Sequence, residues 1–198
     1  VYLQLLVNES PCFLLSGGLD SSVITAIAAK YLSLSGKHVR SFAVDFIGQT
    51  ENFTSDNLHG TPDAPYAREM AEHCHTEHQN IMLNVNDLID PEIRSKIICA
   101  RDIPTSMGDM DISMYLLFQV IHEQSLVAIS GEGADELFGG YPYFFNLLAC
   151  ESSNFPWMAG GDKKRRLGDS FLLHELDIAL DMDRYIKDIY NQSIVHVM

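Results

Sequence analysis

The stretch CFLLSGGLDSS, residues 12–22, decides the fold of this chain. Its first four residues form a short apolar run, which is followed closely by two adjacent glycines, Gly17 and Gly18. An apolar run of this length bounded by glycines is typical of a buried strand that enters a tight turn. Good helix formers with apolar spacing follow from Ser21 to Leu34, and Gly36 closes the segment. The stretch therefore predicts a strand, a glycine loop and a helix in that order.

Strands and helices are expected to alternate beyond this first helix. Three more apolar runs have the length of strands, and three more segments have helical spacing. The expected strands are 39–46, 79–85 and 126–130, and the expected helices are 66–73, 86–100 (capped by Asn86) and 112–123, with loops at 48–65 and 104–111. This alternation is typical of an α/β fold in which helices cover a parallel sheet.

Two glycine-rich segments, 16–18 and 131–140, each come directly after an expected strand. In open parallel sheets, ligands bind beyond the carboxyl ends of the strands. We therefore expect both segments to lie at the same edge of the sheet and to form the ligand site there.

The alternation stops after Tyr141, and residues 147–198 have a helical pattern. We expect residues 1–150 to form the α/β core and residues 151–198 to form a helical C-terminal part. The chain begins with Val1 rather than Met, so we also expect it to be a piece of a longer protein.

Composition excludes some classes of partner. The net charge is −14, from 27 acidic and 13 basic residues, which argues against nucleic acid as a partner. A single nucleotide is not excluded, because backbone N–H groups and a metal ion can hold it. No apolar run approaches the roughly 20 residues of a membrane helix, so we expect no membrane partner. The four cysteines are scattered and none forms a CxxC pair, which is typical of a reducing, cytoplasmic setting.

The first glycine loop has the residues of an anion site. Adjacent glycines let backbone N–H groups point inward, and Ser21 and Ser22 place hydroxyl groups at a helix N-terminus, where the dipole favours an anion. Asp20 would repel phosphate groups unless a cation lay between them, so it is a candidate Mg²⁺ ligand. The Walker spacing and its lysine are missing, and so is the GxGxxG pattern. The alternative is an ordinary strand–turn–helix with a serine cap.

The second glycine segment belongs to the string SGEGADELFGGY, residues 130–141. Carboxylates on a glycine-rich loop that faces a phosphate site indicate Mg²⁺ binding or proton transfer. The alternative is an acidic surface turn. That alternative does not explain why the carboxylates follow a buried strand and are enclosed by four glycines.

Both strings resemble those of a known family. SGGLDSS is similar to the loop of enzymes that split ATP into AMP and pyrophosphate, which asparagine synthetase, GMP synthetase and NAD synthetase share. Residues 130–141 are very similar to the second signature of the asparagine synthetase family. The resemblance covers roughly residues 11–150 and includes SFAV at 41–44. It implies the adenine-nucleotide α-hydrolase fold of the PP-loop ATP pyrophosphatases.

The resemblance also implies roles for individual residues. Leu15 and Val44 would contact the nucleotide base, and Asp20 and Asp135 would hold Mg²⁺. Ser130 and Gly131 would border the adenylate, while Glu132 would position or deprotonate the incoming nitrogen. The residues that would cradle the pyrophosphate are Ser16, Gly17, Gly18, Ser21 and Ser22.

The implied reaction is ATP-dependent amide formation. A carboxylate, aspartate or a related acid, would attack the α-phosphorus of ATP to give an acyl-adenylate and pyrophosphate. Ammonia from a glutaminase domain or subunit would then displace AMP. The oligomeric state stays open, with a homodimer as one possibility.

The chain also departs from the family pattern. No N-terminal nucleophilic Cys is present, and Cys12 lies inside the first strand, so we expect no glutaminase activity from this chain. The family's later segment with an RVPF-type motif and a catalytic lysine has no counterpart before Met198, so we expect little amide formation by this piece alone. The basic run 163–166 is interpreted as a solvated face. IPTSMGDMDIS at 103–113 looks closer to a divergent branch that includes natural-product amidotransferases.

Three alternatives stay open. One is another ATP pyrophosphatase such as an NAD or GMP synthetase, against which residues 131–141 argue. Another is a natural-product amide synthetase. The third is a truncated, non-catalytic nucleotide-binding remnant, against which the intact Asp20, Glu132 and Asp135 argue.

Overall fold

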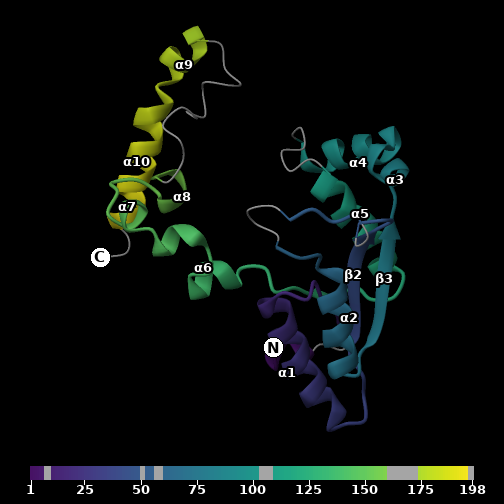
Figure 1. Cartoon of the computed structure of the whole chain (residues 1–198). Coiled ribbons are helices and arrows are strands. Elements are labelled where there is room, and N and C mark those ends of the chain that lie inside the picture. The colour runs from purple at the N-terminus through teal and green to yellow at the C-terminus, as the bar shows by residue number, and fades with distance from the viewer. Residues whose placement is uncertain (7–9, 50–51, 56–59, 103–108, 160–173, 196–198) are drawn as a thin grey trace. The chain divides into compact units, whose positions relative to one another are not determined.

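The computed structural model describes residues 1–6, 10–49, 52–55, 60–102, 109–159 and 174–195 (Figure 1). The chain divides into two compact units, Val1–Glu132 and Gly133–Met198.

The first unit contains a parallel sheet of four strands. The strands are β1 (Cys12–Leu14), β2 (Arg40–Phe46), β3 (Glu77–Leu83) and β4 (Ala128–Ile129), in the order β3-β2-β1-β4. Cys12 pairs with Arg40 on one side and with Ala128 on the other. The predicted α/β fold with a parallel sheet is therefore confirmed.

Helices lie on both faces of this sheet because successive residues of a strand point to opposite faces. On one face, Cys12 and Phe42 pack with Leu117 and Ile121 of helix α5. On the other face, Phe13 packs with Ala28 of α1. Ala43, on that second face, packs with Ala67 and Ala71 of α2. The helical elements of this unit are η1 (Leu3–Leu6), α1 (Leu19–Ser33), α2 (Ala64–His73), α3 (Val85–Ile89), α4 (Pro91–Arg101) and α5 (Asp109–His122).

The single helix predicted at 86–100 is wrong, because the chain forms two helices there. Asn84, not Asn86, caps α3: its side chain accepts hydrogen bonds from the backbone N–H groups of Asn86 (2.7 Å) and Asp87 (3.3 Å). Asp90 then caps α4, in extended backbone before Pro91. A residue before proline is disfavoured in the helical region, so the break follows from the Asp-Pro pair.

The loop predicted at 104–111 is wrong at its end, since α5 begins at Asp109. Asp111, on α5, forms an ion pair with Arg101 of α4. This contact between distant segments could not be read from the local sequence. Residues 103–108, the larger part of the IPTSMGDMDIS segment, lie outside the described residues.

The strand order reverses its direction at β1. The chain runs outward from β1 through β2 to β3, and then returns to place β4 on the other side of β1. Such a reversal leaves a crevice at the carboxyl ends of the two strands that flank it, where ligands of open α/β sheets bind. Here the two strands are β1 and β4, and each is followed by one of the two glycine segments.

The second unit is helical in its described residues. Its elements are α6 (Ala134–Phe138), η2 (Pro142–Phe145), α7 (Leu147–Cys150), α8 (Pro156–Ala159), α9 (His174–Leu180) and α10 (Met182–Val195). The ring of Trp157 stacks on Phe155, with 4.8 Å between centroids, and Phe155 meets Tyr190 edge-on. The basic run at 163–166 lies outside the described residues. Across the described part of the chain, no helix combines the length and apolar character needed to cross a bilayer.

Candidate functional site

Gly17, in the loop after β1, is fixed by a close approach to α2. Its φ is +86°, in the left-handed region that favours glycine. A Cβ at this position would lie 2.5 Å from the backbone nitrogen of Ala67 and 2.7 Å from Cβ of Tyr66. No side chain fits there, so the loop rests directly against the first turn of α2. The sequence predicted the glycine turn but not its support by α2.

Ser21 maintains the shape of this loop. Its side chain is almost fully buried, with 8% exposure, and its hydroxyl donates to the carbonyl of Gly18 at 3.2 Å. The same oxygen accepts from the backbone N–H of Ser16 at 3.3 Å and lies 3.0 Å from the Ser16 hydroxyl oxygen. Ser16 itself is exposed, and its hydroxyl accepts from the N–H of Gly18 at 3.4 Å. Ser21 therefore positions the loop, while Ser16 faces solvent.

The N-terminus of α1 has the properties of an anion site. Gly18 is its N-cap and has no side chain, so no side-chain cap bonds the N–H groups of the first turn. The backbone N–H of Ser22 donates to the carbonyl of Gly18 at 3.1 Å, as the regular helix requires. Asp20 and Ser22 lie half-buried in this turn. Uncapped N–H groups at the positive end of a 15-residue helix favour a phosphate.

Gly131, which follows β4, lies against this same turn. A Cβ on Gly131 would be 2.9 Å from the backbone nitrogen of Ser21, and 3.1 Å from both the carbonyl carbon and Cβ of Asp20. The next residue, Glu132, is exposed, and its N–H donates to the Ser130 hydroxyl at 3.1 Å. The expectation that the two glycine segments meet at one edge is confirmed for this part of the second segment.

A cavity of about 540 Å³ opens beside the loop, at the carboxyl ends of β1 and β2. Leu15 and Val44, predicted to contact the base, both line it together with Ser16. The N–H of Leu15 donates to the carbonyl of Phe42 at 2.8 Å, which continues the sheet by one residue. The volume lies within the range of small-ligand sites, roughly 300–1,000 Å³.

Some residues of this cavity were missed by the sequence analysis. Met110 and Met114, which the sequence analysis did not assign to the site, lie half-exposed on α5 and line the cavity. Asp63, just before α2, also lines it. The spacing of the two methionines, one helical turn apart, was the available signal, but such spacing is also common in cores.

Asp135 lies in the second unit, in the first turn of α6. The predicted loop 131–140 is therefore wrong in part, because ADELF forms a helical turn that Gly139 ends with a φ of +70°. A Cβ on Gly140 would fall 1.9 Å from Oδ1 of Asp135, so only glycine leaves room for this carboxylate. The neighbouring carboxylate, Glu136, accepts a hydrogen bond from Tyr141 at 2.7 Å, which raises the pKa of Tyr141 to about 12.

Among the described residues, no three or more His, Cys, Asp or Glu side chains form a group that could hold a metal ion. Asp20 and Asp135 belong to different units, and their joint role as Mg²⁺ ligands stays a prediction.

Comparison with known proteins identifies a family for this chain. Residues 1–197 match the family model described as asparagine synthase. The chain is 33% identical over 192 residues to asparagine synthetase [glutamine-hydrolyzing] 3 of Bacillus subtilis (strain 168), an alignment that covers 96% of this chain and 30% of that protein.

Two further relatives are similar over a shorter stretch. Asparagine synthetase B [glutamine-hydrolyzing] of Escherichia coli (strain K12) is 38% identical over 133 residues, which cover 66% of this chain and 23% of that protein. Asparagine synthetase [glutamine-hydrolyzing] of Asparagus officinalis is 36% identical over 138 residues, which cover 66% of this chain and 21% of that protein. The chain therefore spans less than a third of the length of these relatives.

Proposed function

Because this chain belongs to the asparagine synthase family, we propose that it carries the ATP-binding, amide-forming site of an ATP-dependent carbon–nitrogen ligase. One observation supports this most strongly. The loops after β1 and β4 flank the point where the strand order reverses, and Gly131, in the loop after β4, contacts Asp20 and Ser21 in the first turn of α1. The first string and the start of the second, residues 130–132, thus lie at one edge of the sheet within the first unit.

The residues present at this edge fit a nucleotide. The base would occupy the cavity lined by Leu15 and Val44. The pyrophosphate would lie at the uncapped start of α1, near Ser16, Gly17 and Gly18, where glycines allow the backbone to approach closely. Ser21 would act through the loop that its hydroxyl holds together.

Asp20 and Asp135 are the proposed ligands of Mg²⁺. Magnesium is usually held by one or two carboxylates together with substrate phosphates rather than by a cage of protein ligands, so two aspartates are a suitable donor set. When bound, the ion would neutralise charge on the phosphate groups.

The proposed reaction has two steps. An oxygen of the substrate carboxylate forms a bond to the α-phosphorus of ATP, and the bond to pyrophosphate breaks. The nitrogen nucleophile then bonds to the acyl carbon, and AMP leaves. Glu132, exposed beside Ser130 and Gly131, would position this nitrogen or accept its proton. Aspartate or a related acid is the proposed acyl substrate, and ammonia from a glutaminase domain or subunit is the proposed nucleophile. We place the enzyme in the cytoplasm.

Product analysis with the full-length protein tests the proposal. ATP, Mg²⁺ and a panel of carboxylates that includes aspartate should give pyrophosphate and AMP in amounts that depend on the carboxylate. Glu132→Gln should keep carboxylate-dependent ATP–pyrophosphate exchange but lower amide formation by roughly 10²–10⁴-fold, the usual contribution of general acid–base catalysis. Release of ADP, or pyrophosphate release that ignores the carboxylate, would contradict the proposal.

A further inference from the structure

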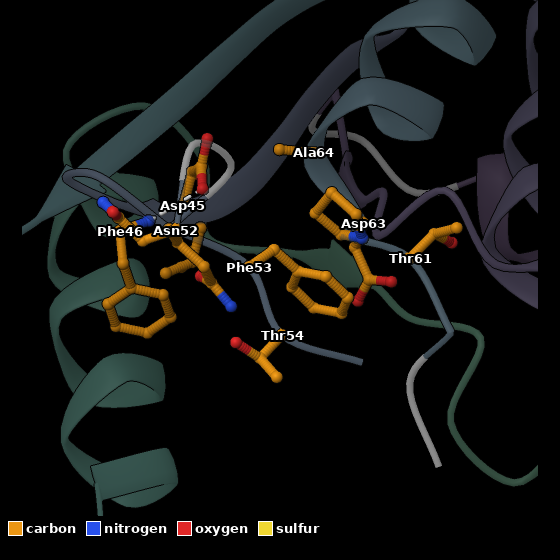
Figure 2. A pocket seen from close by; sticks show the side chains of 11 residues that line it. Asp45, Phe46, Asn52, Phe53, Thr54, Thr61, Asp63 and Ala64 are labelled. Carbon is orange, nitrogen blue, oxygen red and sulfur yellow. Dashed lines mark hydrogen bonds between the residues drawn. The ribbon is translucent and has the colours of Figure 1, made fainter. Parts of the chain in front are cut away.

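A second cavity, of about 440 Å³, lies at the carboxyl end of β2 (Figure 2). It adjoins the first cavity, which Leu15 and Val44 line. Figure 2 shows Asp63 at the start of α2, Phe53 and Thr54 on the segment that follows β2, and Asp45 near the end of β2. Asp63 lines both cavities, as do three other residues, so the two cavities are adjacent within the first unit. A group bound in the second cavity would therefore lie close to a nucleotide bound in the first.

The fold explains why two aspartates line this cavity. Residues of β2 alternate between the faces of the sheet, so Asp45 lies on the same face as Ala43, which packs against Ala67 of α2. Asp63 directly precedes the first residue of α2. The strand end and the helix start are thus neighbours, and each contributes one aspartate.

Neither carboxylate is fully used by the local structure. Asp45 accepts one hydrogen bond at Oδ1, from the N–H of Phe46 at 2.8 Å. Asp63 occupies the N-cap position of α2 but makes no side-chain cap hydrogen bond. Its backbone is helical, with φ −77° and ψ −35°, whereas a capping aspartate normally has extended backbone. Among the described residues, the second carboxylate oxygen of Asp45 and the side chain of Asp63 have no hydrogen-bond donor.

The charge of the cavity selects the ligand. Its described lining contains two aspartates and no Lys, Arg or His. A carboxylate or phosphate group would be repelled there, while a protonated amine would form charge-assisted hydrogen bonds. The ring of Phe53 offers an additional face to a cation. The other polar residues of the described lining carry amide or hydroxyl groups, which can hydrogen-bond to a cation or to an anion.

We infer that this cavity binds the protonated amino group of a substrate and so selects amino-bearing carboxylates for activation. The inference rests on the proposed function for the identity of the substrate, but not for the chemistry of the cavity. The same chemistry would also hold the ammonium form of the nitrogen nucleophile, and the two sources are separable by experiment.

The test measures carboxylate-dependent ATP–pyrophosphate exchange by the full-length protein with matched acids, 4-aminobutyrate against butyrate and aspartate against succinate. Asp45→Asn and Asp63→Asn remove the charges and keep the shapes. Glu69→Gln, at an exposed position on α2 outside the cavity lining, is the matched control. In each aspartate variant the KM of the amino-bearing acid, relative to its partner acid, should rise roughly tenfold, as for one lost hydrogen bond to a charged group. The control should retain the wild-type ratio.

Each outcome bears on the inference. An unchanged ratio, together with a raised KM for ammonia in the complete reaction, supports the cavity and assigns it to the nucleophile. If neither quantity changes beyond the control, the inference is overturned.

A wild-type protein that exchanges pyrophosphate with no carboxylate would refute the proposed function instead. The cavity is then judged by saturation-transfer NMR with n-butylammonium and butyrate as probes. Binding of n-butylammonium alone, weakened in both aspartate variants and intact in Glu69→Gln, supports it. Equal binding of the two probes refutes it.

Discussion

Replacing Gly131 by alanine tests whether the two glycine segments depend on each other. The added Cβ would lie 2.9 Å from the backbone nitrogen of Ser21, about 0.5 Å inside the 3.4 Å at which ordinary contact begins. The atoms it meets belong mainly to backbone, at Asp20 and Ser21, and cannot rotate away as a flexible side chain could. The φ of Gly131 lies outside the left-handed region, so the substitution adds a steric overlap and no backbone strain.

The size of the effect follows from this overlap. Overpacking by one methyl group at a tight contact costs roughly 1–3 kcal/mol of unfolding free energy. For a chain of this size, each kcal/mol lowers Tm by about 2–4 °C. If the start of α1 moves to relieve the overlap, ATP binding has to return it to its original position. Each 1.4 kcal/mol or so of binding free energy spent on this movement weakens the ATP affinity about tenfold.

Calorimetry supplies both readouts, thermal unfolding for Tm and titration for ATP affinity. Gly60→Ala is the control, because Gly60 is exposed and an added Cβ there would meet nothing within 4 Å. We expect the control to match the wild type and Gly131→Ala to lose both stability and ATP affinity. A Tm and an ATP affinity of Gly131→Ala equal to those of the wild type would mean that the second segment does not contact the α1 turn. The proposed arrangement of the site would then be wrong.

Two other predictions concern charges. Asp20→Asn and Asp135→Asn should each weaken Mg²⁺-dependent ATP binding. If both aspartates hold one ion, the double variant should lose less binding free energy than the sum of the two single losses. Fully additive losses in titrations with and without Mg²⁺ would mean that the two aspartates do not share an ion. His78, whose pKa is lowered from 6.5 mainly by burial, should take up a proton less readily in the folded than in the unfolded state. Stability should therefore fall as pH drops below about 6.5 toward the lowered pKa. His78→Gln should remove that part of the Tm decrease between pH 7.5 and 5, and an equal decrease in both proteins would contradict the assignment.

The strands were predictable because short, largely apolar runs lie close to glycine or polar residues, and the parallel sheet followed from their alternation with helices. The division of α3 from α4 was also predictable from the sequence. Asn84 is a cap residue for α3, Asp90 is a cap residue for α4, and Pro91 is typical of the first position of a helix. We predicted Asn86 as the cap, although Asn84 has Asp87 three residues later as its capping-box partner.

The site was predictable only where a motif carries it. Gly17 and Gly131 could be named from their strings, but their contacts could not, because α2 and α1 supply the opposing atoms. Ser21 was predicted to cradle phosphate, which stays a prediction, but the bond of its hydroxyl within the loop could not be foreseen from the string. Asp63 and Met114 have no local pattern that separates a cavity residue from a surface residue. Their role follows from packing between elements distant in sequence, which periodicity does not encode.

The meeting of the two segments depends on a very short strand. β4 has two residues, so few ladder bonds hold Gly131 in place beside the α1 turn. Arg40 on β2 compensates, because its guanidinium donates to the carbonyls of Gln124 (2.9 Å), before β4, and Ser10 (3.1 Å), before β1.

The buried Ser125 hydroxyl adds a second tie to the carbonyl of Ser10, at 3.0 Å. Both ties lie at the amino ends of the strands, opposite the site. β1 and β4 pair in register beyond these hydrogen bonds, with Cys12 opposite Ala128 and Phe13 opposite Ile129. Polar side chains at one edge of the sheet therefore support the register that leads to Gly131 at the other, which neither glycine motif would reveal.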